Sequence, residues 1–175
     1  MPKLLAFSGA GISAESNIPT FQDIPGIRDK LTRSFATNNP QAYSAVIEEM
    51  RSYIDKAEPN AAHYALAQYQ VPVITMNIDG LHQRAGSNKV IAVHGDLANI
   101  VLYGDLAPAY ATAYQQVEQL EAGDTLLVIG ASLATQFSYE LRLLAQSKGA
   151  RVVEIQEQAA SLVPEFLQTY FQENE

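Results

Sequence analysis

The chain has 175 residues, 47% of them hydrophobic, which is enough apolar material for a packed core and excludes a disordered chain. Its formal net charge of −8 argues against a broad nucleic-acid surface, and no apolar stretch is long enough to span a membrane. Cysteine is absent, which excludes disulfides and cysteine-ligated zinc and favours a cytoplasmic protein. His63, His82 and His94 form no closely spaced pair, so we expect no metal site.

The first motif is a glycine-rich turn that follows an apolar run. Leu4–Phe7 predicts a buried parallel strand, and Gly9, Gly11 and Ala14 then give the spacing G-x-G-x-x-A. In this pattern the first glycine permits a tight turn, the second lets the backbone approach a diphosphate, and the small third residue lets a helix pack on the strand. The motif alone does not separate a dinucleotide-binding turn from a purely structural one.

The segment after this turn lacks the second strand that a dehydrogenase would need. Residues 22–39 are mixed and polar and show no strand pattern. Dehydrogenases hold the ribose with an acidic residue at the end of that strand, about 20 residues past the glycines. Asp29 lies at a suitable distance but not on a predicted strand, which argues against hydride-transfer chemistry.

Two helices are expected next. Pro40–Lys56 has the pattern of an amphipathic helix that begins after Asn39. Its apolar stripe either packs in the core or covers one wall of a nucleotide cleft; the stripe consists of Tyr43, Val46, Ile47, Met50 and Ile54. A second helix begins at Asn60 and contains His63, which we expect to be a packed residue rather than a ligand.

Polar residues or glycine follow three successive apolar segments. Val71–Asn77, Val90–Val93 and Ile100–Tyr103 predict strands. The residues at or just beyond their ends are Asn77, Asp79, Gly80 and His82, then His94 and Gly95, then Gly104 and Asp105. Ligands of open parallel sheets bind beyond the carboxyl ends of the strands, so we expect a site there.

The second half of the chain continues the alternation of helices and strands. Apolar stripes over residues 110–120 and 141–148 predict helices on either side of the strand Thr125–Ile129, which breaks at Gly130. Arg151–Ile155 is the last clear strand, and Pro164–Phe171 suits a docked amphipathic helix. No linker or repeat divides the chain. We therefore predict an α/β fold with a doubly wound, Rossmann-like parallel sheet in a single domain over residues 1–175.

Several segments, in the right order along nearly the whole chain, resemble the sirtuin family of NAD-dependent protein deacylases and ADP-ribosyltransferases. The segments are GAGIS at 9–13, IPTF at 18–21, PNAAHYAL at 59–66, TMNIDGLHQRAGS at 75–87, VHG at 93–95, YGD at 103–105 and VIGASL at 128–133. The segment NIDGLH, which begins at Asn77, is the most specific of these. An unrelated nucleotide-binding α/β domain would have to carry it by accident.

The resemblance implies NAD as cofactor and a role for each matched position. The implied cofactor-binding residues are Gly9, Ala10, Gly11, Ser13, Phe21, Gln22, Met76, Asn77, Asp79, Gly130, Ser132 and Gln156. The three residues from Gly9 would line the diphosphate, Phe21 would cover the nicotinamide or its ribose, and Asn77 and Asp79 would hold the nicotinamide end. His94 would be the general base on the ribose hydroxyls. Gly130, Ser132 and Gln156 would lie on the adenosine side.

The chain also departs from the family pattern. The four-cysteine zinc module that normally follows the catalytic histidine is missing, because Tyr103 comes soon after His94. Met76 replaces a glutamine and Gln22 an arginine near the NAD, while Ala131 replaces a threonine and a proline is lost near Phe137. The first two changes remove polar contacts to NAD, and the last, with the missing module, alters the region where a peptide would dock.

These observations predict a zinc-free NAD-dependent deacylase that transfers the acyl group of an acyl-lysine peptide or protein to ADP-ribose. The alternatives are an ADP-ribosyltransferase or NAD hydrolase, and a non-catalytic sensor of NAD or ADP-ribose. His94 favours an enzyme, because a sensor needs no base there, whereas Met76 and Gln22 favour the sensor. No nucleic-acid or membrane partner is expected, and the sequence leaves the oligomeric state open.

Overall fold

A five-stranded parallel sheet forms the centre of the computed structural model, which describes residues 2–20 and 23–174. The strands are β1 (Leu4–Ser8), β2 (Val73–Thr75), β3 (Val90–Ala92), β6 (Thr125–Ile129) and β7 (Arg151–Ile155). Their order is β3-β2-β1-β6-β7, and each neighbouring pair is parallel. This order runs outward in both directions from β1, which confirms the predicted doubly wound, Rossmann-like sheet.

The two central strands are buried on both faces. β1 pairs with β6 in register from Leu4 opposite Thr125 to Ser8 opposite Ile129, and every residue of both strands is buried. Side chains alternate between the two faces of a strand, so Leu4 and Ala6 join one core cluster while Leu5 and Phe7 join the other. The continuous apolar runs of the sequence reflect this double burial.

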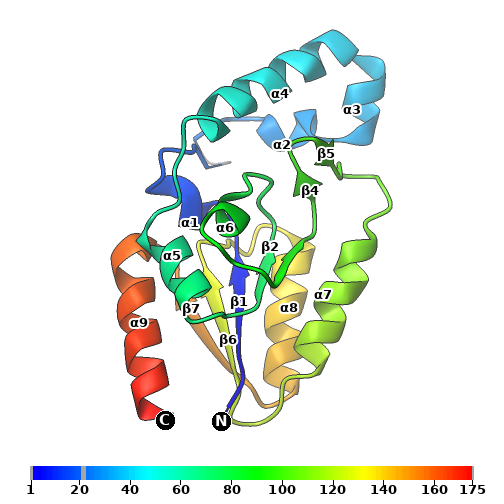
Figure 1. Ribbon diagram of the computed structural model, residues 1–175. Helices are drawn as coiled ribbons and strands as arrows, with labels where there is room; N and C mark the ends of the chain where they lie inside the picture. Colours follow the sequence, from blue (N-terminus) through cyan, green and yellow to red (C-terminus); the bar gives the residue numbers. More distant parts are fainter. Residues whose placement is uncertain (1, 21–22, 175) are drawn as a thin grey trace.

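Helices cover both faces of the sheet (Figure 1). One face carries α5 (Ala61–Gln68) and α9 (Ala159–Glu173), which pack against each other and bury Leu66 and Leu167. The other carries α7 (Pro108–Glu118) and α8 (Gln136–Ser147), which bury Val117 and Leu141. Two one-turn helices, α1 (Gly11–Ala14) and α6 (Leu81–Arg84), follow β1 and β2. Within the described chain, no helix is both long and apolar enough to cross a membrane.

A smaller group of elements lies beyond the carboxyl ends of the strands, at the top of Figure 1. It contains α2 (Ile27–Lys30), α3 (Arg33–Asn38), α4 (Pro40–Ile54) and the hairpin of β4 (Gly95–Asp96) with β5 (Asn99–Ile100). Its own apolar cluster has Ile27, Leu31, Val46 and Leu102 at its centre. We call this group the cap. Residues 23–39 contain two short helices and no strand within the described positions, as the sequence indicated.

The prediction of a strand over Ile100–Tyr103 is wrong. Only Asn99 and Ile100 are extended in a ladder, and they pair with β4 in an antiparallel hairpin outside the main sheet. Asp96 closes the hairpin, because its Oδ1 accepts hydrogen bonds from the backbone N–H groups of Ala98 and Asn99, both at 2.9 Å. Ile100, Leu102 and Tyr103 belong to the apolar cluster of the cap, so this apolar stretch packs within the cap and does not extend the sheet.

The C-terminal helix is longer than expected. The predicted segment Pro164–Phe171 is helical, but α9 begins five residues earlier, at Ala159, and Pro164 lies inside it. Ala159 and Val163 are buried against the sheet, and Tyr69 of the α5 end stacks on Phe171 with ring centroids 4.7 Å apart. Proline has no N–H group to donate within the helix, which destabilises it. The free energy gained by packing the apolar face of α9 outweighs this cost.

Candidate active site

A cavity of about 600 Å³ lies between the carboxyl edge of the sheet and the cap. Ten of the predicted site residues line it: Ala10, Gly11, Ser13, Met76, Asn77, Asp79, His94, Gly130, Ser132 and Gln156. Gly9 lies next to them in the same loop, and its carbonyl contacts the site through Asn77. Phe21 and Gln22 lie outside the described residues. The topology therefore brings together residues from the ends of all five strands of the sheet, which are far apart in sequence.

The two glycine loops cross each other closely. The N–H of Gly9 donates to the Ile129 carbonyl at 3.0 Å, and the N–H of Gly11 donates to the Gly130 carbonyl at 2.9 Å. A Cβ atom on Gly11 would lie 2.5 Å from the Gly130 Cα, and one on Gly9 would lie 2.7 Å from the Gly130 carbonyl oxygen. Glycine is therefore required at these positions by the packing of one loop on the other, before any ligand is considered.

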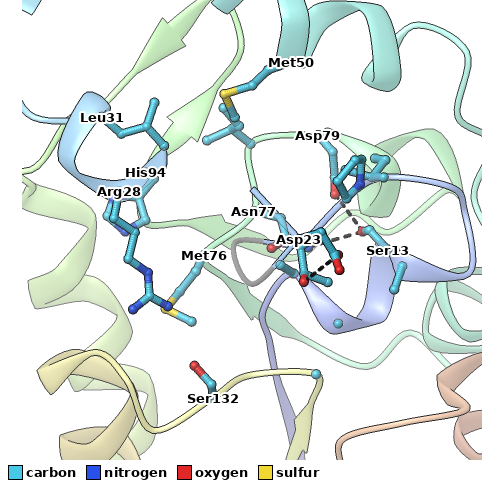
Figure 2. A pocket seen from close by; sticks show the side chains of 18 of the residues that line it. Ser13, Asp23, Arg28, Leu31, Met50, Met76, Asn77, Asp79, His94 and Ser132 are labelled. Atoms are coloured by element: carbon cyan, nitrogen blue, oxygen red, sulfur yellow. Dashed lines mark hydrogen bonds between the residues drawn. The ribbon is translucent and has the colours of Figure 1, made fainter. Parts of the chain in front are cut away.

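Ser13, Asn77 and Asp79 form a hydrogen-bonded cluster on one side of the cavity (Figure 2). The Ser13 hydroxyl donates to Asp79 Oδ2 at 2.7 Å and accepts from Asn77 Nδ2 at 3.3 Å. Asn77 Nδ2 also donates to the Gly9 carbonyl at 3.0 Å. The second oxygen of Asp79 accepts the N–H of Leu81 at 2.9 Å, which ties the cluster to the start of α6.

This cluster sets the orientation of the Asn77 amide. Since its nitrogen donates to Gly9 and Ser13, its Oδ1 oxygen is turned the other way, and it has no hydrogen-bond partner within the described part of the chain. Both Asp79 oxygens are already bound, and the residue is only 8% exposed. Asp79 thus holds Ser13 and the α6 turn in place, and Asn77 offers an acceptor to a ligand.

His94 lies across the cavity from this cluster, just beyond β3 (Figure 2). Its Nδ1 lies 3.1 Å from the Val101 carbonyl, which can only accept, so Nδ1 carries the proton. Nε2 is then the acceptor, and the Tyr110 hydroxyl donates to it at 3.1 Å. Burial lowers the pKa of His94, an effect that the Val101 hydrogen bond partly offsets. Burial also raises the pKa of Tyr110 to about 12, so its hydroxyl stays protonated. The imidazole is therefore neutral near pH 7, with a lone pair on Nε2.

The end of the cavity near β7 is formed around the Ala131 carbonyl. This carbonyl accepts from Arg142 Nη2 at 2.5 Å and from Gln156 Nε2 at 3.3 Å. Gln156 also donates to Glu154 Oε2 at 2.7 Å, and Arg142 pairs with Glu154 at 2.8 Å. These contacts hold the loop after β6 against the end of β7. They place Ser132 and Gln156 together on the cavity wall.

Sequence reasoning missed most of the wall that the cap supplies. Leu31, Met50, Ile54, Ile100 and Leu102 make this wall apolar, and Arg28 and Tyr103 add polar groups. The apolar stripe of α4 was expected either to pack in the core or to cover a cavity wall, and it does both. Val46 lies in the cap core, while Met50 and Ile54 line the cavity. Nothing local in residues 22–39 indicates which side chains turn inward, since α2 is a single turn.

Two buried histidines lie under this site. His63 of α5 and His82 of α6 are at most 1% exposed, and their ring centroids are 4.9 Å apart. His82 Nε2 is 2.8 Å from the Ser8 hydroxyl, and His63 Nδ1 accepts the N–H of Asn60 at 3.3 Å. Burial lowers the pKa of His63 to about 4 and that of His82 to about 3. The packed role expected for His63 is confirmed.

Acid is expected to destabilise the chain through this histidine pair. An unfolded histidine takes up a proton near pH ~6.5, whereas the folded pair stays neutral down to about 4 and about 3. Stability is therefore unaffected by the pair above pH ~6.5 and falls as the pH drops toward the folded values. Between about pH 7.5 and 5 we expect a loss of about 2 kcal/mol for each histidine.

Urea unfolding at several pH values measures this loss. The variant His63→Gln cannot titrate at that position, so its unfolding free energy should fall by about 2 kcal/mol less than that of the wild type between pH ~7.5 and ~5, whatever its absolute stability. A wild-type unfolding free energy that stays constant between pH ~6.5 and ~5 would contradict the assignment.

No group of three or more His, Asp or Glu side chains suited to a metal ion occurs among residues 2–20 and 23–174. The segment between His94 and Tyr103, where the resemblance places a zinc module, consists of the β4–β5 hairpin and the short stretch after it.

Comparison with known proteins identifies the family. A model of the Sir2 family matches residues 9–100. The "NAD-dependent protein deacylase 2" of Archaeoglobus fulgidus is 30% identical over an alignment of 211 positions that covers 93% of this chain and 83% of the relative. The "NAD-dependent protein deacylase 1" of Caldanaerobacter subterraneus is 31% identical, with 86% of this chain and 81% of the relative covered. The first alignment is longer than this chain, so that relative carries segments that this chain lacks.

Solved structures agree with this assignment. A crystal structure of a Sir2 homologue in complex with NAD superposes with a TM-score of 0.88 at 22% identity, covering 99% of this chain and 91% of that chain. A Sir2 mutant with a p53 peptide and NAD superposes with a TM-score of 0.80 at 25% identity, covering 98% and 93%. The sheet order, the strand-end site and the matched sequence segments thus have one common explanation: the chain belongs to the Sir2 family.

Proposed function

We propose that this chain is an NAD-dependent protein-lysine deacylase that cleaves the nicotinamide–ribose bond and transfers the acyl group to ADP-ribose. The observation that carries the proposal is the placement of an outward-facing Asn77 amide oxygen and a neutral His94 in one cavity, beside two crossing glycine loops. The names of the relatives and the NAD complexes of Sir2 structures support it. We also infer a cytoplasmic location, on the basis of the cysteine-free sequence.

The cavity suits a dinucleotide. Its volume of about 600 Å³ lies within the ordinary range for cofactor sites. The backbone at Ala10 and Gly11 forms the floor near the sheet without large side chains, which suits a diphosphate. Ser132 and Gln156 supply polar groups at the end near β7, where the adenosine would lie. When bound, NAD supplies a ribose carbon that becomes electrophilic as nicotinamide departs.

Asn77 and Asp79 would control that departure. The Asn77 Oδ1 atom would accept a hydrogen bond from the carboxamide and hold the ring in one orientation. Asp79 would act through Ser13, whose hydroxyl it fixes at 2.7 Å, and so keep Asn77 aligned. The apolar cap wall at Met50 and Ile54 would exclude water, which otherwise competes for the sugar.

His94 would act after this bond breaks. Its Nε2 lone pair is the acceptor for a ribose hydroxyl proton, and the Val101 carbonyl keeps the other nitrogen protonated. Tyr110 now donates to Nε2, so its hydroxyl would have to turn away before a ribose hydroxyl could give its proton to this atom.

Two other functions remain as alternatives. ADP-ribosyl transfer or NAD hydrolysis would use the same bond cleavage with another acceptor. A sensor that binds NAD or ADP-ribose without turnover is favoured by Met76, which lines the cavity where the family has a glutamine. The neutral, aligned His94 favours an enzyme, because binding alone does not require a base.

Product analysis separates these functions. The protein is incubated with NAD and a panel of acyl-lysine peptides, with and without a strong chelator, and every product is identified by mass. We expect nicotinamide, free lysine peptide and acyl-ADP-ribose in equal amounts, with no effect of the chelator. Nicotinamide released without peptide would indicate hydrolysis, a peptide carrying ADP-ribose would indicate transfer, and binding without release would indicate a sensor. Each of these three results would overturn the deacylase proposal.

A further inference from the structure

Both ring nitrogens of His94 have a hydrogen-bond partner within the protein. Nδ1 donates to the Val101 carbonyl at 3.1 Å, and the Tyr110 hydroxyl donates to Nε2, also at 3.1 Å. Tyr110 belongs to α7 and is not among the described residues that line the cavity. The lone pair that would take a proton from a ribose hydroxyl is therefore occupied by a protein side chain.

An aromatic cluster between α7, α8 and the sheet holds the Tyr110 ring. Tyr110 stacks on Phe137 of α8, with ring centroids 4.4 Å apart and an angle of 18° between the ring planes. Phe137 is buried and meets Phe7 of β1 and Tyr114 of α7 edge-on, at centroid distances of 5.8 and 5.4 Å. It also lies in the segment where the chain departs from the family pattern. Packing against the sheet thus places the Tyr110 hydroxyl beside His94 without any contribution from a ligand.

The hydrogen bond between Tyr110 and His94 is one that a ligand can break. Its length of 3.1 Å exceeds the roughly 2.7–2.8 Å that is usual for a hydroxyl donor. Tyr110 is half-buried, and its ring is nearly parallel to that of Phe137. A stacked ring can slide along the face of its partner and keep most of the packing, so the hydroxyl can leave Nε2 at a small cost.

The other titratable groups around His94 leave this hydrogen bond intact near neutral pH. Tyr103, from the loop after β5, meets His94 edge-on with ring centroids 5.4 Å apart. Burial raises the pKa of Tyr103 and raises that of Tyr110 to about 12, so both phenols stay protonated. Arg28 offsets part of the pKa shift of Tyr103, and Asp79 lies across the cavity. Because neither phenol ionises in this range, the titration of His94 reports the hydrogen bond from Tyr110.

We propose that Tyr110 is a positioning residue that blocks the His94 base in the unliganded chain and gives up its place on Nε2 to a ribose hydroxyl when NAD binds. The inference rests on the proposed function, because it takes His94 as the base and NAD as the ligand. A hydroxyl that donates to Nε2 stabilises the neutral ring, since a protonated Nε2 can no longer accept a hydrogen bond. Tyr110 thus supports the tautomer that the reaction needs, and it makes access to the lone pair depend on the arrival of the ribose.

Titration of the histidine ring signals by NMR, in unliganded wild-type protein and in Tyr110→Phe, tests the block directly. Phenylalanine keeps the stack on Phe137 and removes only the hydroxyl. Loss of one hydrogen bond to the neutral ring should let His94 bind a proton about 2- to 10-fold more tightly, which raises its pKa. The other two histidines of the chain, His63 and His82, have pKa values of about 4 and about 3, so their signals can be told apart.

The matched control is Tyr114→Phe. It removes a hydroxyl from the same helix, one turn further along, where Tyr114 donates to Glu140 and also touches Phe137. The substitution therefore tests the loss of a phenol from the same aromatic cluster without touching His94. We expect the pKa of His94 to be unchanged in this variant.

Calorimetric binding of ADP-ribose tests whether the ribose takes the place of the Tyr110 hydroxyl. At pH ~8 the His94 ring is neutral, so protonation does not contribute to binding. The wild-type protein has to break the hydrogen bond to bind the ligand, whereas Tyr110→Phe does not. We expect Tyr110→Phe to bind ADP-ribose about 2- to 10-fold more tightly than the wild type, and Tyr114→Phe to bind it equally well.

The outcomes distinguish this inference from the proposed function. A His94 pKa that stays the same in Tyr110→Phe, or that rises equally in Tyr114→Phe, would overturn the inference alone. A raised pKa with an unchanged ADP-ribose affinity would also overturn it, because the hydrogen bond would then persist when the ligand is bound. Failure of the wild-type protein to bind both NAD and ADP-ribose would overturn the proposed function and the inference together.

Discussion

Replacing His94 with alanine is expected to lower deacylation by roughly 10²–10⁴-fold, the loss typical of a missing general base. Exchange of free nicotinamide into NAD should survive in part, because the carbon–nitrogen bond breaks before the base acts. The structure provides the physical reason: Nε2 bears the lone pair of a neutral ring whose Nδ1 proton is held by the Val101 carbonyl, and a ribose hydroxyl would replace the Tyr110 hydroxyl as its donor. Since burial lowers the pKa of His94, wild-type deacylation should fall only below pH ~6.5, as the ring becomes protonated.

Asp79→Asn is expected to suppress both reactions. Asparagine keeps an acceptor for the Leu81 N–H but replaces the charged acceptor of Ser13 with a weaker or misdirected one. Ser13 and Asn77 then lose their fixed orientation, and the nicotinamide amide is no longer held for departure. The contrast between the two variants therefore assigns the two residues to successive steps.

The measurement is exchange of labelled nicotinamide beside product formation, with a melting curve for each variant. Asp55→Asn, an exposed substitution just after α4, serves as the matched control and should leave both rates unchanged. Equal losses of exchange and deacylation in His94→Ala would rule out the proposed order of events. Losses that track the fall in melting temperature would mean that both residues are purely structural.

Gly11→Val is expected to destabilise the fold and abolish dinucleotide binding together. Its Cβ would lie 2.5 Å from the Cα of Gly130 and 3.0 Å from the Gly130 carbonyl oxygen, so backbone on both sides would have to move. Overpacking typically costs about 1–3 kcal/mol, and the upper end is expected here because the atoms in the way are backbone. The crossing that it breaks is also the floor of the cavity, so a folded variant with normal ADP-ribose affinity is not expected.

Chemical denaturation and ADP-ribose titration of the same variant measure the two effects. Gly26→Ala is a useful comparison, because Gly26 has a positive φ of 71° but no atom within 4 Å of an added Cβ. It should cost only the ~1–2 kcal/mol of a left-handed residue and leave binding nearly intact. An unfolding free energy for Gly11→Val within about 1 kcal/mol of wild type would show that the loops can separate freely, contrary to this packing argument.

Strands β1 and β6 could be predicted from the sequence because each is a nearly continuous apolar segment in a parallel sheet. The site residues after β2 and β3 could also be located, because the carboxyl ends of parallel strands lie at one edge. Asn77, Asp79 and His94 were found in this way, and they line one cavity. The family followed from motifs that keep their order along the chain.

Other features depend on contacts between distant segments, which no local pattern encodes. Gly11 and Gly130 are required because two loops cross at that point, and the hydrogen bond from Tyr110 to His94 exists because α7 packs beside β3. Ile100 belongs to a hairpin and not to the sheet because Asp96 turns the chain back. Arg28 faces the cavity because its neighbours on a single helical turn are buried in the cap. The local sequence determined the strands and the identity of the candidate site residues. Their positions relative to one another depend on how distant loops pack together, which only the tertiary structure decides.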